Sequence, residues 1–347
     1  MENVTICSFN VENLFVRYKV FEFLPGDKFK RKVLSPKELE QKGGFLPGQL
    51  YKSSFRLFDK EEWRKLTAKA IMGYGDNGGK KFPDIVCLQE VDSMDALRLF
   101  NEDYLESEYS SAILLDSHDP RRIDVGILSK LKVSGIKTNM YEPYKGTELK
   151  QEYLFSRDCL EINFETTNGK SLTLYVNHLK SNYSDVKDPI KKKLEEEKNN
   201  NLRLKQAEKV RDLVRDKFPG NSFKKENFIV LGDFNDTPGS PFLVPLLEEI
   251  GMEDVVSRLD FKERWTHFWQ KENSVSQLDY ILLSPRLSKN AMKPYIERRG
   301  LSNKVKKFTH LGSKKGEKIP FNFSRFPGVT DRIDASDHCP VFVSLKM

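Results

Sequence analysis

Short apolar runs recur along the chain, and polar or turn-forming residues bound most of them. Residues 228–231, Phe-Ile-Val-Leu, are followed by Gly232 and then by Asp233, Asn235 and Asp236. A continuous apolar run of this length predicts a strand that is buried on both faces. Comparable runs or alternating patterns predict further strands at 3–15, 83–91, 111–116, 124–130, 157–165, 171–181, 276–284 and 339–347.

Helical spacing separates several of these strands. Residues 59–75 place Trp63, Leu66, Ala70 and Ile71 on one helical face, and 93–105 predict a helix with Ser93 as its N-cap. Residues 190–218 and the region around 240–251 predict two more helices. Many strands follow one another without an intervening helix, which favours an α/β (α+β) fold with mixed or antiparallel sheets. We interpret residues 1–347 as one domain, in which the polar, aperiodic stretch 17–62 is an inserted loop region.

The composition limits the class of protein. A hydrophobic content of 38% with 11% aromatic residues is enough for a substantial core and excludes a wholly disordered chain. No apolar run approaches the ~18 residues that would span a bilayer, and the N-terminus shows no export signal, so we expect a cytoplasmic protein without a membrane partner. The cysteines Cys7, Cys87, Cys159 and Cys339 are widely separated and lie in or beside apolar stretches, which indicates buried, reduced thiols.

The positive charge of the chain is local. Residues 286–332 carry thirteen lysines or arginines against three acidic residues, a net +10 that exceeds the +7 of the whole chain. Such a segment attracts polyanions through counterion release. We interpret 286–332 as a basic insertion, and the alternative is a solvated loop that aids solubility. Its candidate nucleic-acid-binding residues are Lys304, Lys306, Lys307, Lys314 and Lys315.

Polar side chains recur where the predicted strands end. They are Asn10, Glu90, His178, Asp233 with Asn235, and Asp279, while Ser336, Asp337 and His338 precede the last strand. Alternation along a strand would point Asp233 and Asn235 to the same side, and Gly232 would allow close backbone approach. A single aspartate at a strand end is usually a turn former, as we expect for Asp236, and a single histidine is usually structural. The recurrence, however, favours a cation site, and oxygen ligands without thiolates suit Mg²⁺ or Mn²⁺ better than zinc.

The ordered motifs FNVENL, LQEV, VNHLKS, GDFND, LDYILLS and SDHCPV resemble the endonuclease/exonuclease/phosphatase superfamily. This group includes pancreatic-type deoxyribonucleases, exonuclease III and abasic-site endonucleases, inositol polyphosphate phosphatases and sphingomyelinases. The resemblance runs from about residue 3 to 345, with extra length at 17–62 and 286–332. It implies a four-layer α/β sandwich, in which helices flank two packed, mixed β-sheets and the active site lies where strand ends converge.

The resemblance also implies roles for individual residues. Glu90 corresponds to the principal Mg²⁺ ligand, which Mn²⁺ could replace, and Asn10 and Asp337 correspond to residues linked to the metal. Asp233 and Asn235 correspond to the pair that orients the attacking water and the scissile phosphate. Asp279 corresponds to the aspartate that hydrogen-bonds the catalytic histidine, His338.

A second histidine and an arginine are implied in the same way. His178 corresponds to the second histidine of the deoxyribonuclease and phosphatase branches, and Arg157 to an arginine that contacts phosphate. In deoxyribonucleases an acid from an earlier strand pairs with this other histidine. Three candidates remain open for that acid: Asp116, Asp119 and Asp124.

These observations favour a Mg²⁺-dependent nuclease that acts by in-line attack of water, most specifically a DNA endonuclease with weak sequence preference. We expect a monomer without a stable protein partner. The alternative enzyme is a phosphatase or phosphodiesterase for an inositol phosphate or a phospholipid head group, because lysine clusters bind those anions too. A binding module with a decayed site is disfavoured by the complete motif set. The aromatic stretch 264–270 could stack bases, although core packing or loop anchoring is the favoured reading.

Overall fold

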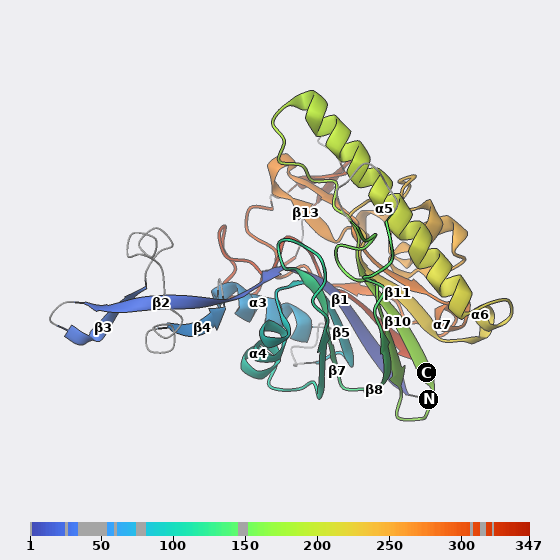
Figure 1. Ribbon diagram of the computed structural model, residues 1–347, viewed down its shortest axis with the longest axis horizontal. Helices are drawn as coiled ribbons and strands as arrows, with labels where there is room; N and C mark the ends of the chain where they lie inside the picture. Colours follow the sequence, from blue (N-terminus) through green and yellow to red (C-terminus); the bar gives the residue numbers. More distant parts are fainter. Residues whose placement is uncertain are drawn as a thin grey trace.

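The computed structural model describes residues 2–24, 27–33, 54–58, 61–73, 81–144, 152–305, 308–312, 317–320 and 323–347. Two six-stranded sheets form its centre (Figure 1). The first sheet has the order β16 (Tyr295–Ile296), β19 (Val341–Lys346), β1 (Asn3–Leu14), β5 (Ile85–Val91), β7 (Asp124–Ser129) and β6 (Ser111–Leu114). The second has the order β12 (Glu253–Asp254), β15 (Asp279–Leu283), β11 (Phe228–Asp233), β10 (Ser171–His178), β9 (Leu160–Glu165) and β8 (Lys132–Lys137).

Both sheets are mixed, as the sequence predicts. Each contains one parallel pair, β1 with β5 and β10 with β11, and its other pairs are antiparallel. The inner faces of the two sheets share one apolar core, to which Ile6 of β1 and Leu231 of β11 belong. The alternate residues of the same strands, such as Cys7 and Val230, pack outward against helices. The central strands therefore read as continuous apolar runs because both of their faces are covered.

Three helices supply the outer layers. The helices α3 (Glu61–Met72) and α4 (Met94–Tyr104) cover the first sheet, and α5 (Pro189–Lys217) covers the second (Figure 1). The Ser93 side chain caps α4 by accepting a hydrogen bond from the Ala96 amide, as predicted. The result is the four-layer α/β sandwich. Short helices at α6 (Ser222–Lys225) and α7 (Pro285–Ser288) lie beside the second sheet.

Two predictions about secondary structure are wrong. Described residues within 17–62 form a three-stranded antiparallel sheet of β2 (Val16–Leu24), β3 (Asp27–Val33) and β4 (Ser54–Phe58), which extends away from the sandwich (Figure 1). The sequence of β2 alternates Val16, Tyr18 and Val20 with Arg17 and Lys19, which is the period of a strand, and the loop prediction overlooked this signal. The helix predicted near 240–251 is only a π-helical turn, Pro245–Glu249, because prolines at 241 and 245 remove backbone donors.

The basic segment contributes to a smaller sheet. This four-stranded sheet has the order β13 (His267–Trp269), β14 (Ser274–Ser276), β17 (Phe308–Leu311) and β18 (Lys318–Pro320). Lys306, Lys307, Lys314 and Lys315 lie outside the described residues. All four cysteines are buried free thiols. Among the described residues there is no helix whose length and apolar character would let it cross a bilayer.

Candidate active site

The polar residues at the strand ends meet at one edge of the sandwich. In the first sheet, Asn10 of β1 lies opposite Gln89, the neighbour of Glu90. In the second, Asp233 of β11 lies opposite both His178 and Asp279. The Asn10 side chain joins the two sheets, because its Nδ2 donates a hydrogen bond to Asp233 Oδ2 at 3.0 Å. Residues distant in sequence therefore form a single cluster.

Gly232 permits the close contact between β10 and β11 at this edge. Its φ is +131°, and a Cβ built there would lie 1.9 Å from the carbonyl oxygen of Asn177. No side chain fits at such a distance, so the strand can deliver Asp233 beside His178 only with glycine before it. The close approach predicted for Gly232 is confirmed.

Asp233 is the centre of the cluster and is almost fully buried. Its Oδ1 accepts a 2.8 Å hydrogen bond from the Asn235 backbone amide, and its Oδ2 accepts a 3.2 Å bond from Asn235 Nδ2. The Nε2 atoms of His178 and His338 lie 3.6 and 3.9 Å from the same Oδ2. Burial raises the pKa of Asp233 to about 6, with a further contribution from the charge of Asp279, although His338 and Asn10 oppose the shift.

Asn235 meets Asp233 for a different reason from the one that strand alternation suggests. β11 ends at Asp233, and Asn235 has a left-handed backbone with φ of +54°. Asparagine is among the residues that adopt this conformation readily. The turn directs the Asn235 amide back to Asp233 and also to the Leu179 carbonyl, at 3.0 Å. The predicted proximity of Asn235 to Asp233 is therefore present, but the turn after β11 produces it and strand alternation does not.

The carboxylate of Asp279 orients the His338 ring, and Thr266 in turn orients that carboxylate. Asp279 Oδ2 lies 2.8 Å from His338 Nδ1 and accepts a 2.7 Å hydrogen bond from Thr266 Oγ1. Ser336 fixes the backbone, since its hydroxyl donates to the Asn10 carbonyl and accepts from the His338 amide. Burial opposes ionisation of His338, but the carboxylates of Asp279 and Asp233 outweigh it and raise the pKa of His338 well above its ordinary value. We expect a charged imidazole at neutral pH.

His178 has the opposite electrostatic character. Burial, together with the charges of Arg157 and Arg121, lowers the pKa of His178 well below its ordinary value. Its Nδ1 is buried and accepts or donates no hydrogen bond within the described residues. The carboxylate nearest its Nε2 is Asp233. His178 is therefore a neutral imidazole beside a cationic one.

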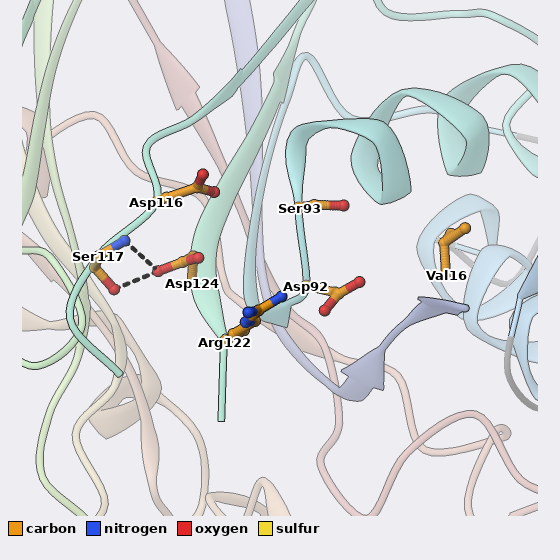
Figure 2. Close-up of a pocket in the computed structure, with 7 residues that line it drawn as sticks. All are labelled: Val16, Asp92, Ser93, Asp116, Ser117, Arg122 and Asp124. Atoms are coloured by element: carbon orange, nitrogen blue, oxygen red, sulfur yellow. Dashed lines mark hydrogen bonds between the residues drawn. The ribbon is translucent and has the colours of Figure 1, made fainter. Parts of the chain in front are cut away.

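None of the three acids considered for His178 pairs with it in the described part of the chain. Asp119 instead binds Arg157 and Arg121, and Asp124 accepts from the backbone and hydroxyl of Ser117. Figure 2 shows Asp116 and Asp124 in a cavity of about 580 Å³. The other lining residues of this cavity are Val16, Asp92, Ser93, Ser117 and Arg122. The acid partner proposed by resemblance thus has no counterpart among these three.

Arg157 is buried and directs its guanidinium at protein atoms. Its Nε donates to the His178 carbonyl at 2.9 Å, its Nη2 to the Leu179 carbonyl at 2.6 Å, and its Nη1 to Asp119 at 3.1 Å. These bonds fix the end of β10. A direct phosphate contact by Arg157 stays a prediction, and the present contacts favour a positioning role.

The donors around Glu90 fit a hard cation. Glu90 has a left-handed φ of +68° and accepts one hydrogen bond from the Asn13 amide at 3.1 Å. Its charge interacts electrostatically with that of the buried Arg157. The Asn10 amide oxygen accepts a 3.1 Å hydrogen bond from the Glu12 backbone amide, and Asp337 is half-exposed. Oxygen donors of this kind suit Mg²⁺. Within the described residues the groups with metal-ligand spacing are His267, Asp337, His338 and Asp233, Asp279, His338, and neither contains Glu90.

Sequence reasoning missed two residues near the cluster. The ring of His267 lies 4.6 Å from that of His338, and its Nε2 lies 3.7 Å from Asp337 Oδ2. Lys180 is half-buried, and burial with the charges of Arg157 and Arg121 lowers its pKa. His267 stands in the aromatic stretch that we interpreted as packing, and Lys180 follows His178 by two positions. The sequence could have identified them only by residue type, a histidine and a lysine, and by their places beside Trp269 and His178.

The family pattern described as Endonuclease/Exonuclease/phosphatase family matches residues 61–338. The chain belongs to this family. Its fold is that of a phosphohydrolase of the family, whose enzymes act on phosphate esters and depend on divalent metals. No curated protein sequence matches the chain.

Solved structures resemble the whole chain in fold. Truncated TDP2 of Caenorhabditis elegans is 16% identical, with 99% of this chain and 98% of that chain covered and a TM-score of 0.51. The human nocturnin catalytic domain with bound sulfate anion is 13% identical over 99% and 94% of the two chains, with a TM-score of 0.54. An endonuclease/exonuclease/phosphatase family protein of Bacteroides thetaiotaomicron is 14% identical over 99% and 98%, with a TM-score of 0.51. At such identities the likeness concerns the fold and leaves the substrate open.

Proposed function

We propose that the chain is a Mg²⁺-dependent phosphodiesterase that cleaves nucleic acid, most specifically a DNA endonuclease with weak sequence preference. The observation that carries this proposal is the cluster around Asp233, in which one buried carboxylate meets a cationic histidine, a neutral histidine and two asparagines. The cluster opens into a cavity of about 770 Å³ lined by Asn235, Asp337 and His338. A phosphate placed there would contact the proton donor His338, which lines the cavity.

The residues divide the reaction between them. Glu90, Asn10 and Asp337 would hold the divalent cation, which neutralises charge on the phosphate as the transition state develops. Asp233 accepts a proton from the attacking water, whose oxygen bonds to phosphorus as the bond to the leaving oxygen breaks in line. His338, kept charged by Asp279, gives a proton to that leaving oxygen. Asn235 orients the phosphate.

The surroundings favour an extended anionic substrate. A second cavity of about 310 Å³ borders Asp337, and its lining includes the cations Lys271, Lys304 and Arg332 as well as the acids Glu12, Asp331 and Asp334. Lys304 is exposed, and its Nζ lies 3.3 Å from the Gln270 side-chain oxygen. Cations beside the scissile position would bind flanking phosphates. We expect affinity for DNA to fall steeply between low and moderate salt, and affinity that is independent of salt would contradict the nucleic-acid proposal.

A phosphatase or phosphodiesterase for an inositol phosphate or a phospholipid head group is the second candidate. The observation that favours it is the size of the 310 Å³ cavity, which matches a small ligand. Its basic residues would suit a compact polyanion as well as a polymer.

The test compares four substrates. Supercoiled plasmid, linear duplex, RNA and an inositol polyphosphate are each incubated with the protein and Mg²⁺, with and without EDTA. We expect nicking of the plasmid that EDTA abolishes and that His338→Ala reduces by about 10²–10⁴-fold. His118→Ala is the matched control, because this exposed histidine stacks on Tyr153 outside the cluster. Release of inorganic phosphate without chain scission would favour the second candidate, and no hydrolysis of any phosphate ester would overturn both.

A further inference from the structure

The cavity that contains His338 also has an aromatic wall. Tyr183, in the segment between β10 and α5, and Trp269, the last residue of β13, both line it, together with Lys271. Tyr183 is 53% exposed, and Trp269 is half-buried and borders the second cavity as well. Two rings from separate elements therefore face the space in which a substrate would lie.

A lysine is held over both rings. Lys271 Nζ lies 5.6 Å from the centroid of the Tyr183 ring and 5.7 Å from that of Trp269. Among the described residues Lys271 forms no ion pair, so these cation–π contacts hold it. Such contacts are weak at exposed sites. A ligand that offers a better partner to the rings can therefore displace the ammonium group.

The aromatic wall is connected to the catalytic cluster. The Trp269 ring lies 6.2 Å from that of His267, which in turn lies 4.6 Å from that of His338. Trp265 in the same stretch differs, because it is buried and is covered by the Arg298 guanidinium at 4.2 Å. Packing thus explains the burial of Trp265. It does not explain Trp269, whose ring borders the cavity and is separated from the His338 ring by that of His267.

We infer that Trp269 and Tyr183 form a nucleobase-binding subsite, in which a base stacks on the rings and Lys271 binds an adjacent phosphate. This inference rests on the proposed function and names its substrate class as a base-bearing polyanion. Every nucleobase has a π-face, so stacking binds nucleic acid without strong sequence preference. A trimethylammonium head group also binds aromatic faces, but the positive charge of Lys271 already lies there and repels it.

The test measures binding without cleavage. In EDTA, the affinity of the protein for a fluorescent single-stranded oligonucleotide is compared with its affinity for an abasic oligomer of equal length. We expect the wild type to bind the base-bearing strand about 5–150-fold more tightly, since one stacked base contributes about 1–3 kcal/mol. In Trp269→Ala this ratio should fall toward one. Phe261→Ala should keep the wild-type ratio, because Phe261 is exposed and lines neither of the two cavities.

A second variant keeps the test valid if Trp269→Ala does not fold. Tyr183→Ala alters an exposed side chain, and it should lower the same ratio. A wild-type ratio of one, or a ratio that both variants retain, would overturn the subsite. So would binding to phosphatidylcholine vesicles that Trp269→Ala abolishes while the oligonucleotide ratio is unchanged. This result can be distinguished from a failure of the proposed function. If the proposed function is wrong, the protein does not cleave in Mg²⁺, whereas the subsite is tested by the binding ratio in EDTA.

Discussion

Asp279 is fully buried, and its Oδ2 accepts one hydrogen bond from Thr266 Oγ1 and faces His338 Nδ1 at 2.8 Å. Its other oxygen, Oδ1, is buried and accepts no hydrogen bond from the described part of the chain. A carboxylate in this position orients the imidazole and stabilises its charged form. The role that the family resemblance assigns to Asp279 is therefore compatible with the observed contacts. A substitution that keeps the fold intact can test this role.

Replacing Asp279 with asparagine keeps the shape and removes the charge. We expect Asp279→Asn to lower kcat by about 10²–10⁴-fold and to lower the pKa of His338, because the nearest anion is lost. The rate is measured on whichever phosphodiester the wild type cleaves, and the pKa by NMR of the ring protons. Asp188→Asn is the control, since Asp188 is exposed and only caps α5. An unchanged His338 pKa would contradict the assignment.

Asp124, which lies opposite Val91 in the first sheet, gives a prediction about stability. This buried residue begins β7, and burial raises its pKa to about 6, with the charges of Asp116 and Asp119 adding to the effect. An acid whose pKa is raised on folding binds its proton more tightly in the folded state. Its contribution to stability is therefore complete below the ordinary pKa of 3.8 and is lost as the pH rises through about 6.

Asp124→Asn should consequently stabilise the fold at neutral pH. The gain is on the order of 1–3 kcal/mol at pH 7.5 and vanishes near pH 4. Urea unfolding at the two pH values measures it, with Asp212→Asn as the control because Asp212 is half-exposed on α5. A gain of the same size at both pH values would show that removal of charge is not its cause.

At the scale of elements, the contact between β10 and β11 depends on the absent side chain of Gly232. A methyl group there would lie 1.9 Å from the Asn177 carbonyl oxygen, and neither strand can move without displacing Asp233. We expect Gly232→Ala to destabilise the fold by at least about 3–4 kcal/mol, near the upper range for single substitutions. The change is measured as the shift in urea midpoint.

Gly239→Ala is the matched control for this substitution. Gly239 also has a positive φ, +85°, but no atom lies within 4 Å of the position that a Cβ would take. It should cost only the backbone strain, about 1–2 kcal/mol. Equal losses for the two variants would mean that the steric contact between β10 and β11 contributes nothing.

The helix α5 and the turn after β11 stabilise each other. The fully buried Arg203 of α5 donates to Asp236 through Nε, at 3.1 Å, and to the Lys180 carbonyl, at 2.8 Å. Asp236 also accepts from Ser240 Oγ and the Thr237 amide. It therefore stabilises the turn, as its sequence position indicates, and the same turn presents Asn235 to Asp233.

For the molecule as a whole, metal binding should appear as stability. A cation that binds only the folded state adds about 2.7 kcal/mol when its concentration is 100 times its Kd. We expect Mg²⁺ to raise the melting temperature of the wild type and to raise that of Glu90→Gln much less. Glu102→Gln, which alters an exposed residue of α4, should respond like the wild type. Calorimetric or dye-based melting over a Mg²⁺ series gives the answer, and equal responses of all three proteins would remove Glu90 from the metal site.

The sequence alone determined the central strands, the three long helices and the α/β class, because an apolar run or a helical stripe is a local signal of burial. It also supplied the motif residues Asn10, Glu90, Asp233 and His338. The loop prediction for 17–62 overlooked the alternation in β2, and the predicted helix near 240–251 is reduced to the π-helical turn at Pro245–Glu249 because prolines interrupt it.

Only the tertiary structure decided which polar groups touch. Asn10 and Asp233 are 223 positions apart and hydrogen-bond because strand pairing and the packing of two sheets bring them together. The same packing directs Arg157 to backbone carbonyls and brings His267 beside His338. It also separates the buried Trp265 from Trp269 at the cavity. Local patterns report whether a residue is buried, but long-range pairing and register select its neighbours, and those neighbours set the chemistry of the site.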